Sequence, residues 1–246
     1  MDRPLALVTG GTRGIGRAIA LRMAADGHDL VLGFARDESA AEAARAAVLE
    51  RGAACTLVRA DLTTDDGIAA TFEACPRVPR VVVANAGATL HVGPLADTPP
   101  EVVRRTVELN LTSALLVARE AVRRMSTARG GAGGVLVMIS SGAATLGSPG
   151  EYVQYAAAKA GVDTLVLGLA QEVADQGVRV VGVAPGLVET TIHADAGDPG
   201  RLARVAGRVP LGRAGTPAEV ADAVAWLASA EASYVTGTTL RVAGGR

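Results

Sequence analysis

Short, nearly continuous apolar runs alternate along the chain with longer segments rich in Ala, Leu, Arg and Glu. The apolar runs lack strict polar–apolar alternation, which is typical of strands buried on both faces of a parallel sheet. They predict strands at residues 5–8, 29–34, 54–59, 80–84, 135–140, 179–183 and 239–242. The longer segments have helix-forming compositions and predict helices at residues 14–26, 39–51, 65–74, 100–127, 152–176 and 217–229.

This order of elements predicts one α/β domain over residues 1–246. We expect a Rossmann-type doubly wound parallel sheet of about seven strands with helices on both faces. Pro100 and Pro217 fit the first turns of two of the helices. The segment 187–213 is less regular and follows the end of a strand, so we expect either a substrate lid or an ordinary surface excursion there.

Composition narrows the classes of function. The net charge is −1 and aromatic residues make up 2% of the chain, so neither nucleic acid nor an anionic membrane is an expected partner. Cys55 and Cys75 do not indicate a disulfide framework, and no spacing of His, Cys, Asp or Glu indicates a metal site. No leader segment or membrane-spanning run is recognisable, so we expect a cytoplasmic protein.

A glycine-rich loop connects the first predicted strand to the first predicted helix, with the sequence Thr9-Gly-Gly-Thr-Arg-Gly-Ile-Gly16. Glycines allow a tight turn and a close approach of phosphate to the backbone, while the start of the helix offers unpaired N–H groups. The loop therefore predicts a dinucleotide site. A P-loop is disfavoured because no Gly-Lys-Ser/Thr follows. The expected cofactor contacts are Gly10, Thr12, Arg13, Gly14, Ile15 and Gly16.

The end of the second predicted strand distinguishes between cofactors. An acidic residue there would bind the ribose 2′-hydroxyl of NAD(H), whereas an arginine would pair with the 2′-phosphate of NADP(H). Arg36 lies at this strand end and Arg13 lies in the glycine loop, so we expect NADP(H) rather than NAD(H). Asp37 is interpreted as a candidate helix cap, and each Arg alone is also compatible with a surface charge.

Two further strand ends carry residues suited to a nucleotide. Asp61-Leu62 follows the third predicted strand, where an acid would hold an adenine amino group. Asn85-Ala86-Gly87 follows the fourth, where small residues let a cofactor lie against the strand end. Helix capping by Asp61 and a simple turn at residues 85–87 are the structural alternatives.

The segment Tyr155-Ala-Ala-Ala-Lys159 places a phenol and an ammonium four residues apart on one face of a predicted helix. A neighbouring cation favours the phenolate, which predicts a lowered pKa for Tyr155 and proton exchange with an alcohol or ketone. Ser141 is the expected hydroxyl partner of the same substrate oxygen, and Ser140 is a weaker candidate. Tyr152 has no lysine four residues later.

These motifs, in this order over essentially the whole chain, make the sequence resemble the classical short-chain dehydrogenase/reductases. The remaining parts of the match are Asn110 in Glu-Leu-Asn-Leu, Pro185-Gly186 with Thr190, and Tyr234-Val-Thr-Gly237 before the closing glycines. The resemblance implies that Tyr155 is the general acid in ketone reduction and the base in alcohol oxidation. It implies that Lys159 lowers the pKa of Tyr155 and binds the nicotinamide ribose, and that Ser141 polarises the substrate oxygen.

The resemblance also implies which residues hold the nicotinamide end. Asn110 would hold a water in a proton relay to Lys159, and a buried asparagine bonded to the backbone is the structural alternative. The spacing departs from the family pattern once, because Ser141 and Tyr155 are fourteen residues apart rather than thirteen. We place the extra residue within residues 150–154. The residues expected to contact the nicotinamide are Pro185, Gly186, Val188 and Thr190.

We therefore expect an NADP(H)-dependent oxidoreductase that transfers a hydride between the nicotinamide and a ketone or secondary alcohol. One alternative is a 3-oxoacyl-[acyl-carrier-protein] reductase. Gln176 stands where such an enzyme would present a basic residue, and Arg124 and Arg129 are candidates to compensate. Another alternative is a non-catalytic NADP(H)-binding regulatory protein, against which the set of Ser141, Tyr155 and Lys159 argues.

The helix predicted at residues 152–176 is apolar on nearly all sides, so a second face of it needs cover. Self-association is the simplest cover, with a contribution from the helix predicted at residues 100–127. The family resemblance implies a homotetramer, or a dimer, built on these helices.

Overall fold

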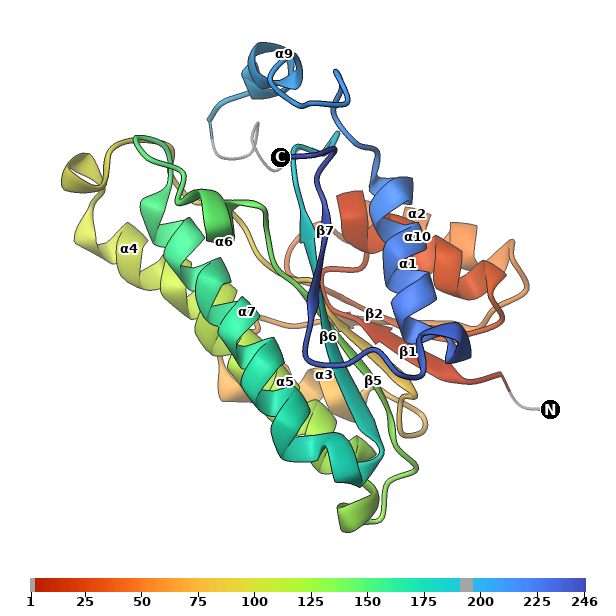
Figure 1. The fold of residues 1–246 in the computed structure, drawn as a ribbon. Coiled ribbons are helices and arrows are strands. Elements are labelled where there is room, and N and C mark those ends of the chain that lie inside the picture. The colour runs from red at the N-terminus through yellow and green to blue at the C-terminus, as the bar shows by residue number, and fades with distance from the viewer. Residues whose placement is uncertain (1–2, 191–196) are drawn as a thin grey trace.

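The structure is a computed structural model that describes residues 3–190 and 197–246. At its centre lies a seven-stranded sheet in the order β3-β2-β1-β4-β5-β6-β7 (Figure 1), in which all neighbouring strands pair in parallel. The predicted doubly wound sheet is confirmed, and each strand end lies within two residues of its expected position. The strands are β1 (Leu5–Val8), β2 (Asp29–Phe34), β3 (Cys55–Arg59), β4 (Val81–Ala84), β5 (Gly134–Ile139), β6 (Val178–Pro185) and β7 (Thr239–Val242).

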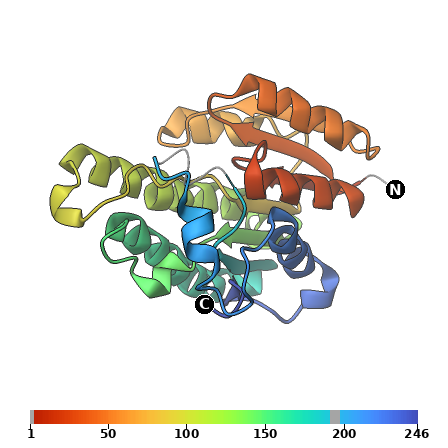
Figure 2. The same ribbon diagram turned by 90° about the horizontal axis from the view of Figure 1, so that it is seen from above.

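Helices cover both faces of the sheet, which gives three layers (Figure 2). One face carries α1 (Gly14–Ala25), α2 (Glu38–Leu49) and α10 (Pro217–Ala228). The other face carries α3 (Asp65–Glu73), α5 (Ser113–Met125) and α7 (Val153–Val173). Outside these layers are α4 (Pro100–Val107), which contacts α7, and two short helices, α6 (Ala143–Leu146) and α9 (Arg201–Ala206).

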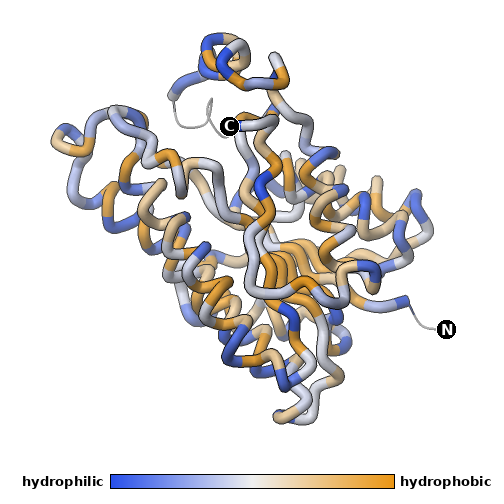
Figure 3. Tube along the Cα trace, in the orientation of Figure 1, coloured by the Kyte–Doolittle hydropathy of each residue, from blue (hydrophilic) through white to orange (hydrophobic). Residues whose placement is uncertain are grey.

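The two cores follow from the period-two geometry of the strands. In β1, Leu5 and Leu7 pack with Phe72 of α3, whereas Val8 packs on the other face with Ile19 of α1. Because both faces are covered, the central strands β1, β4 and β5 carry no polar side chains, and Figure 3 shows a hydrophobic centre surrounded by helices of mixed character. No helix of the described residues is long and apolar enough to cross a membrane.

Three features of the helices were not predicted. The helix expected over residues 100–127 is interrupted by a π-helical turn (Glu108–Thr112) between α4 and α5. Helices α6 and α9 are too short to show a periodic pattern. Helix α9 belongs to the segment 187–213, for which a lid or a surface excursion was expected, and residues 191–196 of that segment lie outside the described part of the chain.

The order of strands reverses beside β1, because β2 lies on one side of it and β4 on the other. Ligands of open α/β sheets bind at the carboxyl ends of strands at such a point. In Figure 1 these ends point toward the top of the molecule, where α6 and α9 also lie.

Candidate active site

The glycine-rich loop turns sharply from β1 into α1. Gly10 and Gly14 have φ angles of 60° and 50°, which favour glycine. A Cβ atom at Gly16 would lie 2.1 Å from the carbonyl oxygen of Gly10, so only glycine lets the helix approach the loop this closely. The N-cap residue Arg13 makes no side-chain cap, and the first turn of α1 contains no acidic residue. The loop therefore presents backbone N–H groups and the positive end of a helix to an anion.

The residues after β4 brace this loop. The side-chain Nδ2 of Asn85 donates to the carbonyl oxygens of Thr9 and Gly10, both at 3.0 Å. The hydroxyl of Thr9 accepts from the backbone N–H groups of Asn85 and Ala86, at 3.0 and 3.1 Å. The structure thus brings these two predicted cofactor segments together, and the side chain of Asn85 holds the loop in shape.

At the end of β2, the alternative interpretation of Asp37 is confirmed. Its side chain accepts from the backbone N–H of Ala40 at 2.9 Å and caps α2. Its second carboxylate oxygen lies 4.0 Å from the guanidinium of Arg13, in an exposed ion pair. Arg36 is exposed beside it. Arg13 and Arg36, the two predicted ligands of a 2′-phosphate, therefore both lie next to Asp37 at the edge of the glycine-rich loop.

Asp61 lies at the end of β3 and accepts from the N–H and the hydroxyl of Thr63, at 3.0 and 2.7 Å. These two hydrogen bonds, together with the charges of Arg105 and Arg36, lower the pKa of Asp61. The neighbouring Leu62 is buried in the core beneath α3 and α5. The carboxylate is therefore ionised and exposed at the sheet edge that carries the glycine-rich loop.

Ser141, Tyr155 and Lys159 meet beyond the end of β5. The Tyr155 side chain is hydrogen-bonded to that of Ser141, so the additional residue between them does not separate the pair. The hydroxyl of Ser141 also accepts from the N–H of Ala143 at 3.1 Å. Ser140 faces another way, because its hydroxyl donates to the carbonyl oxygen of Lys159 at 3.2 Å. The structure thus favours Ser141 over Ser140.

Lys159 follows Tyr155 by one turn of α7, and its Nζ lies 5.8 Å from the centre of the Tyr155 ring. The ammonium donates to the carbonyl oxygen of Ile139 at 2.8 Å. Burial lowers the pKa of Lys159 to about 8, and the nearby charge of Asp163 opposes this shift. Lys159 is also the only lysine in the sequence.

The expected lowering of the Tyr155 pKa is wrong for this structure. Burial raises the pKa of Tyr155 to about 12, and its hydrogen bond with Ser141 only partly opposes that effect. The physical reason is that desolvation of the phenolate outweighs an ammonium that is directed at the carbonyl of Ile139. At neutral pH Tyr155 therefore keeps its proton.

Asn110 lies in the π-helical turn and is fully buried. Its Nδ2 donates to the carbonyl oxygens of Thr106 and Ala88, both at 2.9 Å, and its Oδ1 accepts from the N–H of Ala88 at 3.1 Å. These contacts match the structural alternative for Asn110, and the water relay stays a prediction. A Cβ at Gly87 would lie 2.6 Å from Oδ1 of Asn110 and 3.3 Å from Nζ of Lys159, so the turn after β4 touches both residues.

The residues expected at the nicotinamide end also converge here. The carbonyl oxygen of Pro185 accepts from the N–H of Gly142 at 2.7 Å, which ties the end of β6 to the start of α6. The methyl carbon of Thr190 lies 3.4 Å from the position of a Cβ at Gly14, so Thr190 faces the glycine-rich loop. Val188 pairs with Gly215 in a short bridge.

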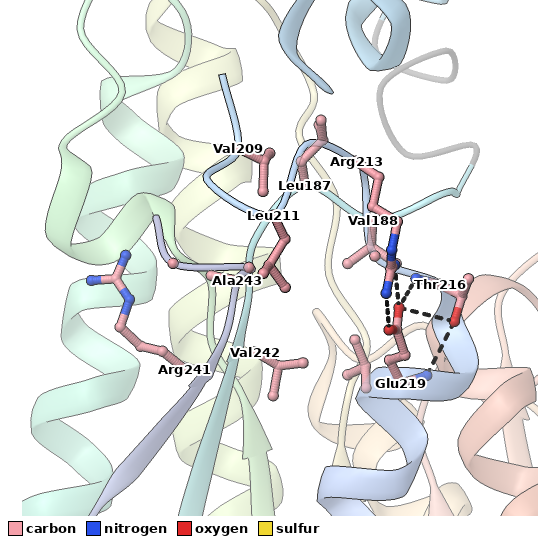
Figure 4. Close-up of a pocket in the computed structure, with 14 residues that line it drawn as sticks. Leu187, Val188, Val209, Leu211, Arg213, Thr216, Glu219, Arg241, Val242 and Ala243 are labelled. Atoms are coloured by element: carbon pink, nitrogen blue, oxygen red, sulfur yellow. Dashed lines mark hydrogen bonds and ion pairs between the residues drawn. The ribbon is translucent and has the colours of Figure 1, made fainter. Parts of the chain in front are cut away.

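Beyond Val188, a hollow of about 350 Å³ opens between β7 and α10, lined by Leu187, Val209 and Leu211 (Figure 4). An ion pair of Arg213 with Glu219 closes one side of it. Ser141, Tyr155 and Lys159 do not line this hollow. The hollow therefore lies beside the three predicted catalytic side chains and does not contain them.

Sequence reasoning missed the surroundings of Tyr155. The ring of Tyr152 meets that of Tyr155 edge to face, with centroids 5.6 Å apart. Ala143, Ala156 and Val92 complete an apolar cluster around the two rings. Tyr152 in turn contacts the buried Arg201 of α9, a pairing across 49 residues that no local pattern signals.

The described residues fit a dinucleotide. The glycines leave space that side chains would fill, and the uncapped start of α1 suits a pyrophosphate. Such a cofactor would extend from Arg36 and Asp61 past the glycine-rich loop to Lys159 and Thr190. A buried proton donor with a neighbouring hydroxyl at one end of that path suits exchange of a proton with a substrate oxygen.

Comparison with known proteins agrees with this geometry. Residues 10–246 match the family described as enoyl-(acyl carrier protein) reductase. The chain is 42% identical to the uncharacterized oxidoreductase YgfF of Escherichia coli K12, over 98% of this chain and 99% of that protein. It is 39% identical to the 3-oxoacyl-[acyl-carrier-protein] reductase FabG of Vibrio cholerae, over 100% of this chain and 98% of that protein.

Among solved structures, a short-chain type dehydrogenase/reductase from Mycobacterium marinum superimposes with a TM-score of 0.90 at 29% identity, covering 98% of this chain and 94% of that chain. The family match, the relatives and the shared fold all cover nearly the whole sequence. The chain belongs to the short-chain dehydrogenase/reductase family, whose members are oxidoreductases that act on CH–OH groups with a nicotinamide cofactor.

Proposed function

We propose that the protein is an NADP(H)-dependent oxidoreductase that interconverts a small ketone and the corresponding secondary alcohol. The observation that carries this proposal is the buried contact between Tyr155 and Ser141, one helical turn from Lys159 and beside the glycine-rich loop. When bound, the cofactor supplies the hydride that the carbonyl carbon accepts in reduction.

Each of the three side chains has a distinct task. The hydroxyl of Ser141, whose oxygen accepts from Ala143, lies beside Tyr155 and donates its hydrogen to the carbonyl oxygen when a substrate is bound there. Tyr155 donates the proton that converts the carbonyl oxygen to a hydroxyl. Its pKa of about 12 keeps that proton in place at neutral pH, so Tyr155 holds a proton to donate. Lys159, one turn after Tyr155 on the same face of α7, binds the nicotinamide ribose.

The test is NADPH oxidation with a panel of small ketones. We expect turnover by the wild type and a loss of roughly 10²–10⁴-fold in Tyr155→Phe, the range for a missing general acid. Tyr234→Phe is the matched control, because Tyr234 is fully exposed. Equal turnover by Tyr155→Phe would show that the assigned mechanism is wrong. Cofactor binding without turnover of any ketone would favour the regulatory alternative.

The preference for NADP(H) rests on Arg13 and Arg36. Asp37, the first acid after this strand end, already caps α2, and Arg13 and Arg36 lie on either side of it in positions suited to a 2′-phosphate. Calorimetry should show tighter binding of NADPH than of NADH. Arg36→Ala should narrow that difference, whereas Arg45→Ala, an exposed arginine of α2 paired with Glu42, should leave it unchanged. Equal or tighter binding of NADH by the wild type would refute the preference.

A 3-oxoacyl-[acyl-carrier-protein] reductase is the second candidate, because a relative at 39% identity carries that name. Gln176 is engaged in a hydrogen bond from Ser126 at 2.7 Å. Arg124 lies over the ring of Phe72 and donates a hydrogen bond to Glu120 at 2.7 Å, so its charge is already paired within this chain. Turnover of a carrier-bound 3-oxoacyl thioester far faster than of the same free thioester would favour this candidate.

We also propose a homotetramer, or a dimer, built on α5 and α7. A shallow hollow between these helices is lined by Leu115, Leu165 and Leu169. Leu115 and Leu167 are 42% and 52% exposed, which leaves an apolar face for a second copy to cover. Light scattering after gel filtration should give a tetramer or dimer mass, and Leu115→Glu should lower it. A monomer mass for the wild type would refute this assembly.

A further inference from the structure

Arg201, the first residue of α9, is buried although it is charged, with only 5% of its surface exposed. Its guanidinium forms a two-pronged ion pair with Glu151, including a bond of 2.7 Å from Nη2 to Oε2. Nη2 also donates to the hydroxyl of Tyr152 at 2.8 Å. A fork of this kind fixes both distance and orientation, so it holds α9 in one place over residues 151–152.

Tyr152 carries this contact to Tyr155. The edge-to-face contact of the two rings, at 5.6 Å and 89°, has the geometry that aromatic pairs prefer. Tyr152 is 6% exposed and packs with Ala143 and Val92 around Tyr155. A movement of Arg201 would therefore free the side chain that forms one wall beside the proton donor.

Glu151 also connects the loop after β4 to Tyr152 and Arg201. Its carbonyl oxygen accepts from the N–H of Gly93, in the loop after β4 that also contributes Val92. Glu151 and Tyr152 lie where the chain has one residue more than the family spacing between Ser141 and Tyr155. The loop thus contacts α9 through Glu151 while Ser141 stays in contact with Tyr155.

On the basis of the proposed ketone reduction, we propose that Arg201 is a positioning and specificity-determining residue. With Glu151 and Tyr152 it forms a latch, here called the Arg201 latch, that holds α9 as a wall of the substrate site. The closed latch keeps Tyr152 against Tyr155 and limits the site to small carbonyl compounds. Because Glu151 already neutralises the guanidinium, the latch selects by size and does not recruit an anionic substrate.

Arg201→Ala opens the latch, and Arg204→Ala is its matched control. Arg204 lies on the same helix, in an exposed ion pair with Asp198. The first readout is backbone hydrogen exchange of residues 197–206. We expect exchange roughly tenfold faster or more in Arg201→Ala, because a buried ion pair holds the helix, and unchanged exchange in the control.

The second readout is kinetic, with one small and one bulky ketone. Arg201→Ala should raise KM for the small ketone roughly tenfold and shift the ratio of kcat/KM toward the bulky one, with the Kd of NADPH unchanged. Arg201→Lys keeps the charge but not the fork, so it should restore part of the selectivity. If Arg201→Ala does not fold, Tyr152→Phe, which lacks only one hydroxyl, takes its place in both readouts.

The proposal is overturned if Arg201→Ala matches Arg204→Ala in both exchange and selectivity. It is also overturned if exchange rises but the preference between the two ketones stays constant, because the latch would then serve stability alone. The exchange experiment does not require turnover. A wild type that reduces no ketone would therefore refute the proposed function and leave the latch itself to be judged by exchange.

Discussion

Replacing Lys159 by methionine should make the protein more stable at neutral pH while it removes activity. Burial lowers the pKa of Lys159 from 10.5 to about 8. At about 1.4 kcal/mol per pKa unit, the folded state holds the charged ammonium at a cost of about 3 kcal/mol. Methionine has a similar length and no charge. Loss of the bond to the carbonyl of Ile139 offsets about 1–2 kcal/mol, so we expect a net gain of about 1–2 kcal/mol at pH 7.

The pH dependence gives a sharper form of this prediction. The folded pKa lies below the unfolded value, so the unfolded chain binds the extra proton between pH 8 and 10.5. The cost of holding the charged Lys159 in the folded state is therefore fully present below pH 8. It is relieved as the pH rises to 10.5, so the wild type gains stability over this range. Urea unfolding of both proteins should show the stability difference moving by about 2 kcal/mol in favour of the wild type between pH 7 and pH 9.5, so that the advantage of Lys159→Met vanishes or reverses.

A direct titration checks the same shift without any variant. Since Lys159 is the only lysine in the sequence, protein labelled with [13C]lysine gives a single Cε resonance that needs no assignment. We expect its midpoint near pH 8. A midpoint near 10.5, together with a stability difference that is flat from pH 7 to 9.5, would refute the argument that burial sets the charge of this residue.

Three further predictions concern other parts of the site. Gly87→Ala should lower stability by about 1–3 kcal/mol and slow turnover, because its Cβ would meet Oδ1 of Asn110 at 2.6 Å; unchanged unfolding and kinetics would contradict this close approach. Asp37→Ala should cost about 1 kcal/mol in urea unfolding through loss of the cap on Ala40, and an unchanged midpoint would show that the cap contributes nothing. Gln154→Met should raise the Tm slightly, because both polar side-chain atoms of Gln154 are buried without a hydrogen-bond partner among the described residues; a clear fall in Tm would show that the amide is satisfied.

The sequence was sufficient for the parts of the fold that depend on local pattern. Apolar runs such as 5–8 identified strands, since strands buried on both faces carry few polar residues. Glycines at Gly10 and Gly14 marked the turn at which φ is positive. The cap of α2 by Asp37 was also an explicit alternative, because the residue precedes a helix-forming segment.

The rest depends on tertiary structure. The π-helical turn around Asn110 has no sequence period of its own, so a continuous helix was expected there. The direction of the Tyr155 pKa shift is set by how deeply the ring is buried, which spacing along a helix does not reveal. The pairing of Glu151 with Arg201 joins residues that are 50 positions apart, and it exists only when α9 lies over the start of α7.

The central claim is that Tyr155 protonates the oxygen of a carbonyl substrate that accepts a hydride from NADPH. A single-turnover reaction with NADPH that carries deuterium in place of both hydrogens at C4 of the nicotinamide tests it most directly. We predict that the wild type forms the deuterated alcohol, and that Tyr155→Phe binds NADPH with the same Kd but transfers deuterium roughly 10²–10⁴-fold more slowly. Transfer by Tyr155→Phe at the wild-type rate, or an alcohol without deuterium, would contradict the account.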